Sequence, residues 1–336
     1  MKSSIARDLV SEYSRRGEIV ADVFCGSGTI PLECVQMGRQ VFASDVSPYA
    51  ITLTKGKLNA PSDLEEASTA LDKALKVAQS RRIDLRRVPS WVRNFYHPKT
   101  LKEILGLLVV LRKRKDYFLL ACLLGVLHHQ RPGFLSFPSS HLVPYLRSKK
   151  FPRENYPEMY EYRSVESRIQ AKVARALKRY EKIDTNLVVG VRRSTIECLN
   201  LPCTVNCFIT SPPYMNALDY GRDNRLRNWF LSGNTQDHID ARLTSDTDFR
   251  RMMSSYARIL TTALAKNGRC VFVVGERATR NGNRSPSEVL SEVLDESAPN
   301  LRIKEIISDQ IPDIRRSRRN SSGVKKEYIL VYERHC

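Results

Sequence analysis

A short apolar run that ends in a glycine turn is the feature that most constrains the fold of this chain. Residues 18–24 are apolar over too short a length for a helix and lead directly into a turn with two glycines, which predicts a buried strand. Residues 30–37 then have helical spacing, and residues 40–45 form a second apolar run that ends in Asp45. This order predicts a βαβ unit of a parallel sheet.

The remaining sequence divides into two kinds of pattern. Residues 61–184 contain amphipathic helical patterns and no strand alternation, which predicts a mostly helical insertion. Residues 1–60 and 185–336 are expected to form one α/β domain around it, with a mostly parallel sheet closed by a C-terminal antiparallel hairpin. The later strands are expected in the apolar runs at 186–190, 205–210, 270–275, 301–307 and 328–332.

The charge of the chain indicates its class of partner. The 336 residues include 55 Lys+Arg and 36 Asp+Glu, a formal net charge of +19. Such a surplus produces a positive field that favours a polyanion, because phosphate neutralisation dominates sequence-independent binding to nucleic acids. The alternative is a basic protein that gains only solubility from its charge.

Membranes and metals are not expected. The N-terminus has no apolar signal segment and no apolar stretch is long enough to cross a bilayer, so we expect a cytoplasmic protein. Eight cysteines and six histidines form no CxxC pair and no two-plus-two ligand pattern. We therefore expect reduced thiols and no metal site.

The glycine turn lies in the motif Asp22-Val-Phe-Cys-Gly-Ser-Gly-Thr29. Glycines at the end of a buried strand let the backbone approach a ligand, and the following helix presents free amide groups. Asp22 is placed to bind the cation of a methionine moiety, and Asp45 at the next strand end is placed to accept ribose hydroxyls. The third glycine of GxGxxG is absent, which disfavours NAD and FAD. The motif predicts a cofactor that carries a nucleoside.

A second motif, Thr210-Ser-Pro-Pro-Tyr214, follows another apolar run. Prolines have no N–H group, so the hydroxyl of Ser211 and the carbonyl of Pro212 are presented as acceptors. An aryl amino group becomes nucleophilic only when acceptors hold its N–H groups, because its lone pair is otherwise delocalised into the ring. Tyr214 offers a flat face for a base swung out of a duplex. The alternative is an ordinary Pro-Pro turn.

Together the two motifs resemble those of the DNA amino-methyltransferases, which read D-x-F-x-G-S-G-T and (D/N/S)-P-P-(Y/F/W). The Thr-Ser-Pro-Pro-Tyr form resembles the subset that methylates N4 of cytosine, and the motif order resembles the family's α arrangement. The resemblance implies a Rossmann-like methyltransferase sheet, S-adenosylmethionine without a metal, and direct transfer to a flipped base of double-stranded DNA. It also implies that residues 61–184 recognise the target sequence, and that a restriction endonuclease is a separate partner protein.

The resemblance also implies roles for individual residues. Asp45 would hold the ribose and Val46 would lie against adenine. Ser211, Pro212 and Pro213 would form the catalytic turn, with Tyr214 stacked on the base. The remaining cofactor-binding positions, around the methionine end, would be Asp22, Phe24, Cys25, Gly26, Ser27, Gly28 and Thr29.

Arginines occur where the family has an acidic residue that contacts the adenine amino group. Residues 189–195 read Val-Gly-Val-Arg-Arg-Ser-Thr after the expected third strand. Two alternatives follow from this departure, a weaker affinity for the cofactor or a substitute contact such as Ser194.

Basic and aromatic residues interleave in the first part of the insertion. This mixture favours contact with phosphates and unstacked bases, and its alternative is a solvated basic face with the aromatics packed beneath. The residues concerned are Arg81, Arg82, Arg86, Arg87, Arg93, Lys99, Arg112, Lys113, Arg114 and Lys115, with Trp91, Phe95, Tyr96 and His97.

Three other functions remain open. An adenine-N6 DNA methyltransferase would use the same two motifs. So would an RNA methyltransferase, although its catalytic motif more often begins with Asp or Asn. A nucleic-acid-binding protein that has lost catalysis is the third alternative.

Overall fold

The computed structural model of the chain describes residues 1–129, 133–136, 152–178, 180–213, 220–233, 246–277, 285–310 and 324–335. The chain forms two compact units. The sheet unit comprises Met1–Thr54, Ile183–Gly221 and Asp237–Cys336, and the helical unit comprises Lys55–Lys182 and Arg222–Gln236. The sequence patterns did not predict that residues 222–236 belong to the helical unit.

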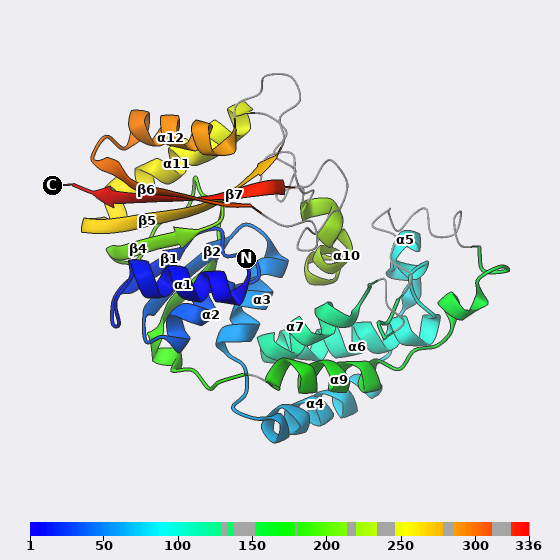
Figure 1. Cartoon of the computed structure of the whole chain (residues 1–336). Helices are drawn as coiled ribbons and strands as arrows, with labels where there is room; N and C mark the ends of the chain where they lie inside the picture. Colours follow the sequence, from blue (N-terminus) through cyan, green and yellow to red (C-terminus); the bar gives the residue numbers. More distant parts are fainter. Residues whose placement is uncertain are drawn as a thin grey trace. The chain divides into compact units, whose positions relative to one another are not determined.

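The described strands of the sheet unit form one sheet in the order β3-β2-β1-β4-β5-β7-β6 (Figure 1). β1 pairs in parallel with β2 and β4, β2 with β3, and β4 with β5, whereas β7 pairs antiparallel with β5 and β6. The strands are β1 (Ile19–Asp22), β2 (Gln40–Asp45), β3 (Val188–Arg193), β4 (Val205–Thr210), β5 (Leu264–Arg277), β6 (Leu301–Gln310) and β7 (Val324–Arg334).

This topology confirms the predicted fold class. A mostly parallel, Rossmann-like sheet ends in an antiparallel pair, and β7 lies between β5 and β6. Strand order reverses between β1 and β4, whose register aligns Ala21 with Phe208. In open parallel sheets, ligands bind outside the carboxyl ends of the strands at such a reversal. A ligand-binding site is therefore expected at the carboxyl ends of β1 and β4.

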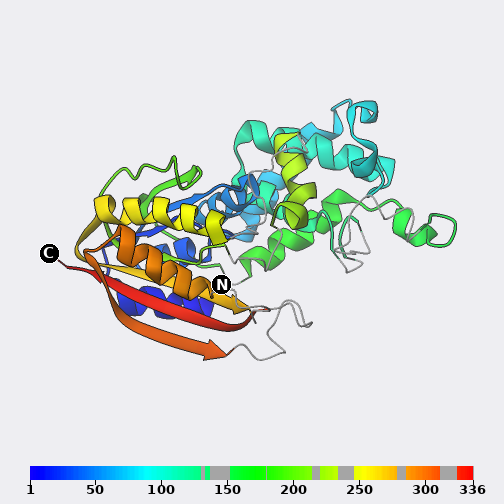
Figure 2. The same cartoon turned by 90° about the horizontal axis from the view of Figure 1, so that it is seen from above.

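Helices cover both faces of the sheet (Figures 1 and 2). Right-handed crossovers place α2, between β1 and β2, on the face opposite to α11, between β4 and β5. α1 packs with α2, and α12 packs with α11. The bounds are α1 (Ser3–Tyr13), α2 (Thr29–Gln36), α11 (Asp246–Ala263) and α12 (Pro286–Ser297). α12, which the sequence patterns did not predict, begins at a capping box between Ser285 and Glu288.

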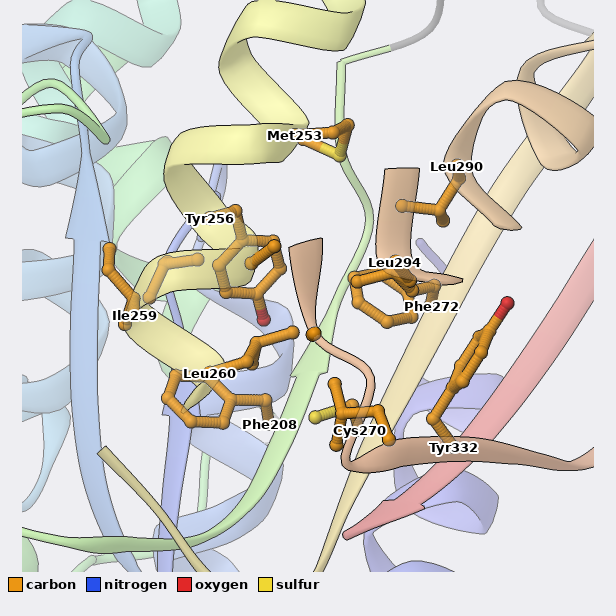
Figure 3. Close-up of a cluster of buried hydrophobic side chains, with 14 of the residues drawn as sticks. Phe208, Met253, Tyr256, Ile259, Leu260, Cys270, Phe272, Leu290, Leu294 and Tyr332 are labelled. Carbon is orange, nitrogen blue, oxygen red and sulfur yellow. The ribbon is translucent and has the colours of Figure 1, made fainter. Parts of the chain in front are cut away.

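A cluster of buried hydrophobic side chains in the sheet unit lies beneath α11 and α12 (Figure 3). Tyr256 of α11 is fully buried there, and its ring lies edge-on to Phe208, Phe272 and Phe24, with centroids 5.8, 5.5 and 5.8 Å away. Edge-to-face pairs of this kind add about 0.5–1.5 kcal/mol each beyond the burial of their area. Through Phe24, this aromatic cluster reaches the glycine motif.

Helices and short turns make up the described part of the helical unit. α3 (Pro48–Leu58) begins in the sheet unit and ends in this one. The side chains of Asp63, His97 and Asp116 cap the first turns of α4, α6 and α7. The main helices are α4 (Leu64–Gln79), α5 (Ser90–Arg93), α6 (Pro98–Arg114), α7 (Tyr117–Val126), α9 (Val165–Leu177) and α10 (Tyr220–Ser232).

α10 joins the helical unit through aromatic and charged contacts. The ring of Trp229 lies 6.3 Å from that of Trp91, and the guanidinium of Arg225 lies 4.7 Å from the centre of the same Trp91 ring. Arg227 donates to the carbonyl oxygens of Leu124 and His128, both at 3.3 Å. The chain thus enters the helical unit shortly after the Ser-Pro-Pro-Tyr motif. No described helix is both long and apolar enough to cross a membrane.

Candidate cofactor and target-base site

The glycine loop joins β1 to α2 through two left-handed residues. Gly26 has φ 49° and Gly28 has φ 72°, a conformation that glycine adopts without the strain of a Cβ atom. The amide of Gly28 donates to the carbonyl of Cys25 at 2.7 Å and closes the turn. A Cβ atom on Gly28 would lie 2.6 Å from the hydroxyl oxygen of Thr54 and 2.8 Å from its Cα. The loop is therefore pressed against α3 with no room for a side chain.

Asp45, the last residue of β2, holds this loop from the other side. Its Oδ2 accepts from the amide of Gly26 at 2.9 Å, and its Oδ1 accepts from the amide of Ser47 at 2.8 Å. A carboxylate can accept about four hydrogen bonds, so these two do not exclude ribose hydroxyls. Asp45, which is predicted to bind the ribose, therefore also positions the backbone of the glycine loop.

Buried hydroxyls flank Asp45. The side-chain oxygens of Ser44 and Ser47 are buried and have no hydrogen-bond partner within the described part of the chain. Buried polar groups are usually satisfied, so an unsatisfied one needs an explanation. A polar ligand at the end of β2 would supply it.

Asp22 lies inside the protein. Only 2% of its surface is exposed, and its Oδ1 accepts from the Thr210 hydroxyl at 2.6 Å and from the Phe24 amide at 3.3 Å. Burial raises the pKa of Asp22 to about 7, against the lowering effects of the bonds from Thr210 and Phe24. This carboxyl therefore interacts with both sequence motifs, whereas the sequence indicated only a methionine cation as its partner.

The other loop residues divide between the core and the surface. Cys25 is buried with Ala43 and Ile51, and its Sγ lies 3.3 Å from the hydroxyl oxygen of Thr54. Burial raises the pKa of the Cys25 thiol well above its usual value, so the thiol stays neutral. Ser27 is exposed at the start of α2, and its hydroxyl lies 3.2 Å from that of Thr29. Phe24 is half-buried against Tyr256.

The Ser-Pro-Pro segment begins where β4 ends. The hydroxyl of Ser211 donates to the carbonyl of Val273 on the neighbouring β5 at 3.0 Å. A hydroxyl whose hydrogen is used in this way acts as an acceptor toward a further partner. Pro212 is buried and Pro213 half-buried. Tyr214 lies outside the described residues.

Arg192 and Arg193 at the end of β3 contact the protein itself. Arg193 aligns with Asp45 in the sheet and donates to the carbonyl of Val46 at 3.1 Å. Arg192 lies over the Phe42 ring, with its guanidinium carbon 5.8 Å from the centroid. The amide of Ser194 donates to the carbonyl of Asp45 at 3.2 Å, while its hydroxyl donates to the Thr195 carbonyl. The arginine segment therefore braces the backbone around Asp45 and Val46.

Two residues that contact these loops, Thr54 and Thr210, were not predicted. Thr54 on α3 is fully buried and contacts both Cys25 and Gly28. Thr210 carries the hydrogen bond to Asp22. Thr210 is the first residue of the second motif, in which only Ser211 to Tyr214 were assigned roles, whereas nothing in the local sequence distinguishes Thr54 from other helical threonines.

The aromatics of the insertion correct one expectation. Phe95 and Tyr96 are 3% and 4% exposed and pack in the core of the helical unit, so they are not available to stack on unstacked bases. The basic residues around them, including Arg86, Arg93 and Arg112, are exposed. Trp91 and His97 are half-buried, so the alternative pattern, a basic face with its aromatics packed beneath, holds for Phe95 and Tyr96.

The described residues of this site offer neither a metal-binding group nor a reactive thiol in β4. No group of three or more His, Cys, Asp and Glu side chains suited to a metal occurs in the described ranges. Cys207 is buried in β4, and burial raises the pKa of its thiol far above neutrality. Thiolate attack from β4 is therefore disfavoured.

Comparison with solved structures gives low-identity matches, and none of the curated proteins matches the chain. TrmN from Thermus thermophilus is 10% identical with a TM-score of 0.35, and the match covers 99% of this chain but only 49% of TrmN. The rRNA methyltransferase aviRa from Streptomyces viridochromogenes is 12% identical with a TM-score of 0.34, covering 99% and 85%. An rRNA methylase from Streptococcus thermophilus is 9% identical with a TM-score of 0.38, covering 99% and 96%.

The sequence comparison is more specific. Residues 3–56 match the N6/N4 methyltransferase family model, which is described as DNA methylase. The matched residues include β1, the glycine loop, Asp45 and most of α3. Over residues 3–56, this chain is therefore similar to the N6/N4 DNA methylases.

Proposed function

We propose that this chain is an S-adenosylmethionine-dependent methyltransferase that modifies an exocyclic amino group in DNA, with N4 of cytosine as the preferred target. One observation carries the proposal. The glycine motif and the Thr-Ser-Pro-Pro motif end adjacent strands β1 and β4 at the reversal of strand order, and Thr210 donates to Asp22 at 2.6 Å. This adjacency supports the proposal that a cofactor motif and a base-binding motif form one site.

The residues present fit this cofactor. The glycine loop has no room for a side chain at Gly28, Asp45 ends β2, and the hydroxyls of Ser44 and Ser47 are buried with no hydrogen-bond partner among the described residues. We propose that the loop holds the methionine end, that Asp45 holds the ribose, and that Val46 lies against adenine. When bound, S-adenosylmethionine supplies a methyl group activated by its sulfonium charge.

The catalytic turn would prepare the target nitrogen. The Ser211 hydroxyl and the Pro212 carbonyl would accept its two N–H groups, which concentrates the lone pair on nitrogen. The bond from Ser211 to Val273 fixes the hydroxyl as an acceptor. Tyr214 would stack on the flipped base. Catalysis of this kind depends on positioning and needs no strong base.

The charge of the two units supports a polyanionic substrate. The helical unit has 30 Lys+Arg against 13 Asp+Glu, a net charge of +17, whereas the sheet unit has 25 against 23, a net charge of +2. Almost all of the chain's net positive charge therefore belongs to the helical unit. We propose that this unit binds the phosphate backbone and recognises the target sequence.

The test is methyl transfer with identification of the product. The protein is incubated with labelled S-adenosylmethionine and genomic DNA or RNA, and the nucleosides are analysed by mass spectrometry. N4-methylcytosine from DNA supports the proposal. N6-methyladenine would reject the preference for cytosine, and label in RNA alone would reject DNA as substrate.

A pair of alanine variants makes the test specific. Ser211→Ala removes the acceptor and is expected to lower kcat by about 100-fold or more, as does the loss of one catalytic hydrogen-bonding group elsewhere. Ser308→Ala, at an exposed position on the edge strand β6, is the matched control and should keep full activity. If Ser211→Ala transfers label as fast as the wild type does, the role assigned to this turn is contradicted.

A further inference from the structure

We propose that Asp22 and Thr210 form a positioning pair, in which one carboxylate oxygen sets the position of the glycine loop relative to the catalytic turn. The pair deepens the proposed function and rests on it. Neither residue would touch a substrate, so both are positioning residues. Asp22 would then link the cofactor site to the target-base site, in place of the predicted contact with the methionine cation.

The geometry places both bonds on a single atom. Asp22 and Thr210 are the last residues of β1 and β4, which pair in parallel. Oδ1 of Asp22 accepts from the Thr210 hydroxyl at 2.6 Å and from the Phe24 amide at 3.3 Å. Thr210 directly precedes Ser211, and Phe24 lies two residues before Gly26. A displacement of either segment must therefore disturb a bond to the same oxygen.

Burial makes this link difficult to replace. Asp22 is 2% exposed and Thr210 is fully buried, so water cannot readily substitute for a lost partner. An O–H···O⁻ distance of 2.5–2.7 Å is typical of a charge-assisted hydrogen bond, and the bond from Thr210 falls in that range. Removal of the Thr210 hydroxyl would leave the buried carboxyl of Asp22 with one hydrogen bond fewer, which is unfavourable.

Several titratable groups surround Asp22 and influence the pKa of its carboxyl. Burial, and to a lesser degree the charge of Asp45 on β2, raise the pKa of Asp22, whereas the bonds from Thr210 and Phe24 and the amino group of Met1 lower it, and the resulting pKa is about 7. Cys25 in the loop, Cys34 on α2 and Tyr256 on α11 also face it electrostatically. Burial raises the pKa values of all three well above their usual ranges, so they stay uncharged. The ionised carboxyl is the stronger acceptor, and the link should weaken below about pH 7.

The test compares Thr210→Val, which removes the hydroxyl at nearly constant shape, with Thr210→Ser, which keeps it. Because the Thr210 bond is the largest influence that lowers the pKa of Asp22, Thr210→Val should move the acidic limb of the kcat profile up by about one unit, the order expected for one hydrogen bond to a charge. Thr210→Ser should keep the wild-type limb. Asp22→Asn keeps an acceptor and should abolish that limb.

Amide hydrogen exchange tests the link without any activity. Thr210→Val should increase exchange in peptides covering the glycine loop, 22–29, as well as in those covering β4. Thr262→Val, at an exposed position near the end of α11, is the matched control and should change neither. If Thr210→Val affects β4 peptides alone and leaves the pH profile in place, the pair has no positioning role.

The two proposals fail in different ways. If the wild type transfers no methyl group to DNA or RNA, the proposed function is rejected, while exchange in the loop peptides still decides whether the link exists. If the wild type is active but all three variants keep its pH profile and its loop exchange, the function stands and the positioning pair is rejected.

Discussion

The substitution Gly28→Ala tests the close packing of the glycine loop against α3. Gly28 has φ 72°, and its added Cβ would lie 2.8 Å from the Cα of Thr54 and 2.6 Å from its hydroxyl oxygen. The hydroxyl can rotate away, but the Cα belongs to the backbone of a helix and cannot move alone. Either the loop or α3 must shift.

Two contributions to the expected loss can be separated. Left-handed backbone strain for a residue with a Cβ is about 1–2 kcal/mol, and overpacking in a well-packed region is about 1–3 kcal/mol. Gly28→Ala should therefore lower the free energy of unfolding of the sheet unit by about 2–5 kcal/mol. Domains are usually stable by about 5–15 kcal/mol, so the variant is expected to fold with reduced stability.

Gly17→Ala is the matched control for strain. Gly17 has φ 84°, and a Cβ there would meet no atom within 4 Å. Gly17→Ala should lower the free energy of unfolding by the strain contribution alone. The difference between the two variants in this free energy then measures the contact with Thr54, at about 1–3 kcal/mol.

The assay must report on the sheet unit. Both tryptophans of the chain, Trp91 and Trp229, belong to the helical unit, so their fluorescence follows the other unit. Amide exchange of β1 and β2 peptides during urea unfolding reports on the sheet unit directly. Equal losses for Gly28→Ala and Gly17→Ala would refute the argument, because the contact with α3 would then contribute nothing.

Three further outcomes are expected. Asp45→Asn should weaken S-adenosylmethionine binding by roughly tenfold to a hundredfold in calorimetry, since a hydrogen bond to a charged group contributes about 1.5–3 kcal/mol, whereas the exposed Asp8→Asn should not. The double change Arg112→Gln and Lys113→Gln should reduce the slope of log K for DNA against log salt by up to about 2, and Arg302→Gln on β6 should leave it unchanged. The folded-state pKa of Asp22, about 7, lies above its ordinary value of 3.8, so this group should contribute stability below about pH 4 that is lost as pH rises through 7, on the order of a few kcal/mol. Asp22→Asn should remove that slope from urea unfolding free energies, and a slope that persists would show that another group is responsible.

The pH dependence of Asp22 implies a conflict between stability and activity. Protonation relieves the unfavourable burial of its charge, while ionisation provides the stronger acceptor for Thr210 and Phe24. A functional site held together by a group of this kind is expected to be less stable at the pH where it is best organised.

Local patterns in the sequence were sufficient for most of the fold. Apolar runs of strand length, the glycine turn and the helical spacing after it predicted β1, α2 and β2 nearly to the residue, and the last two runs predicted the antiparallel closure. These features are local because the spacing of apolar residues within a strand or helix shows which of its faces is buried. The two motifs were recognisable for the same reason, since each is a contiguous loop after a strand.

Tertiary structure alone decided which of the motif residues are buried against the protein and which are exposed. The 2.6 Å bond from Thr210 to Asp22 joins residues 188 positions apart, and it exists because β1 and β4 are neighbours, which no local pattern specifies. Burial likewise placed Cys25 against Thr54, Phe95 and Tyr96 in a core, and α10 with the helical unit. Whether a side chain is buried depends on the elements packed over it, and those come from distant parts of the chain.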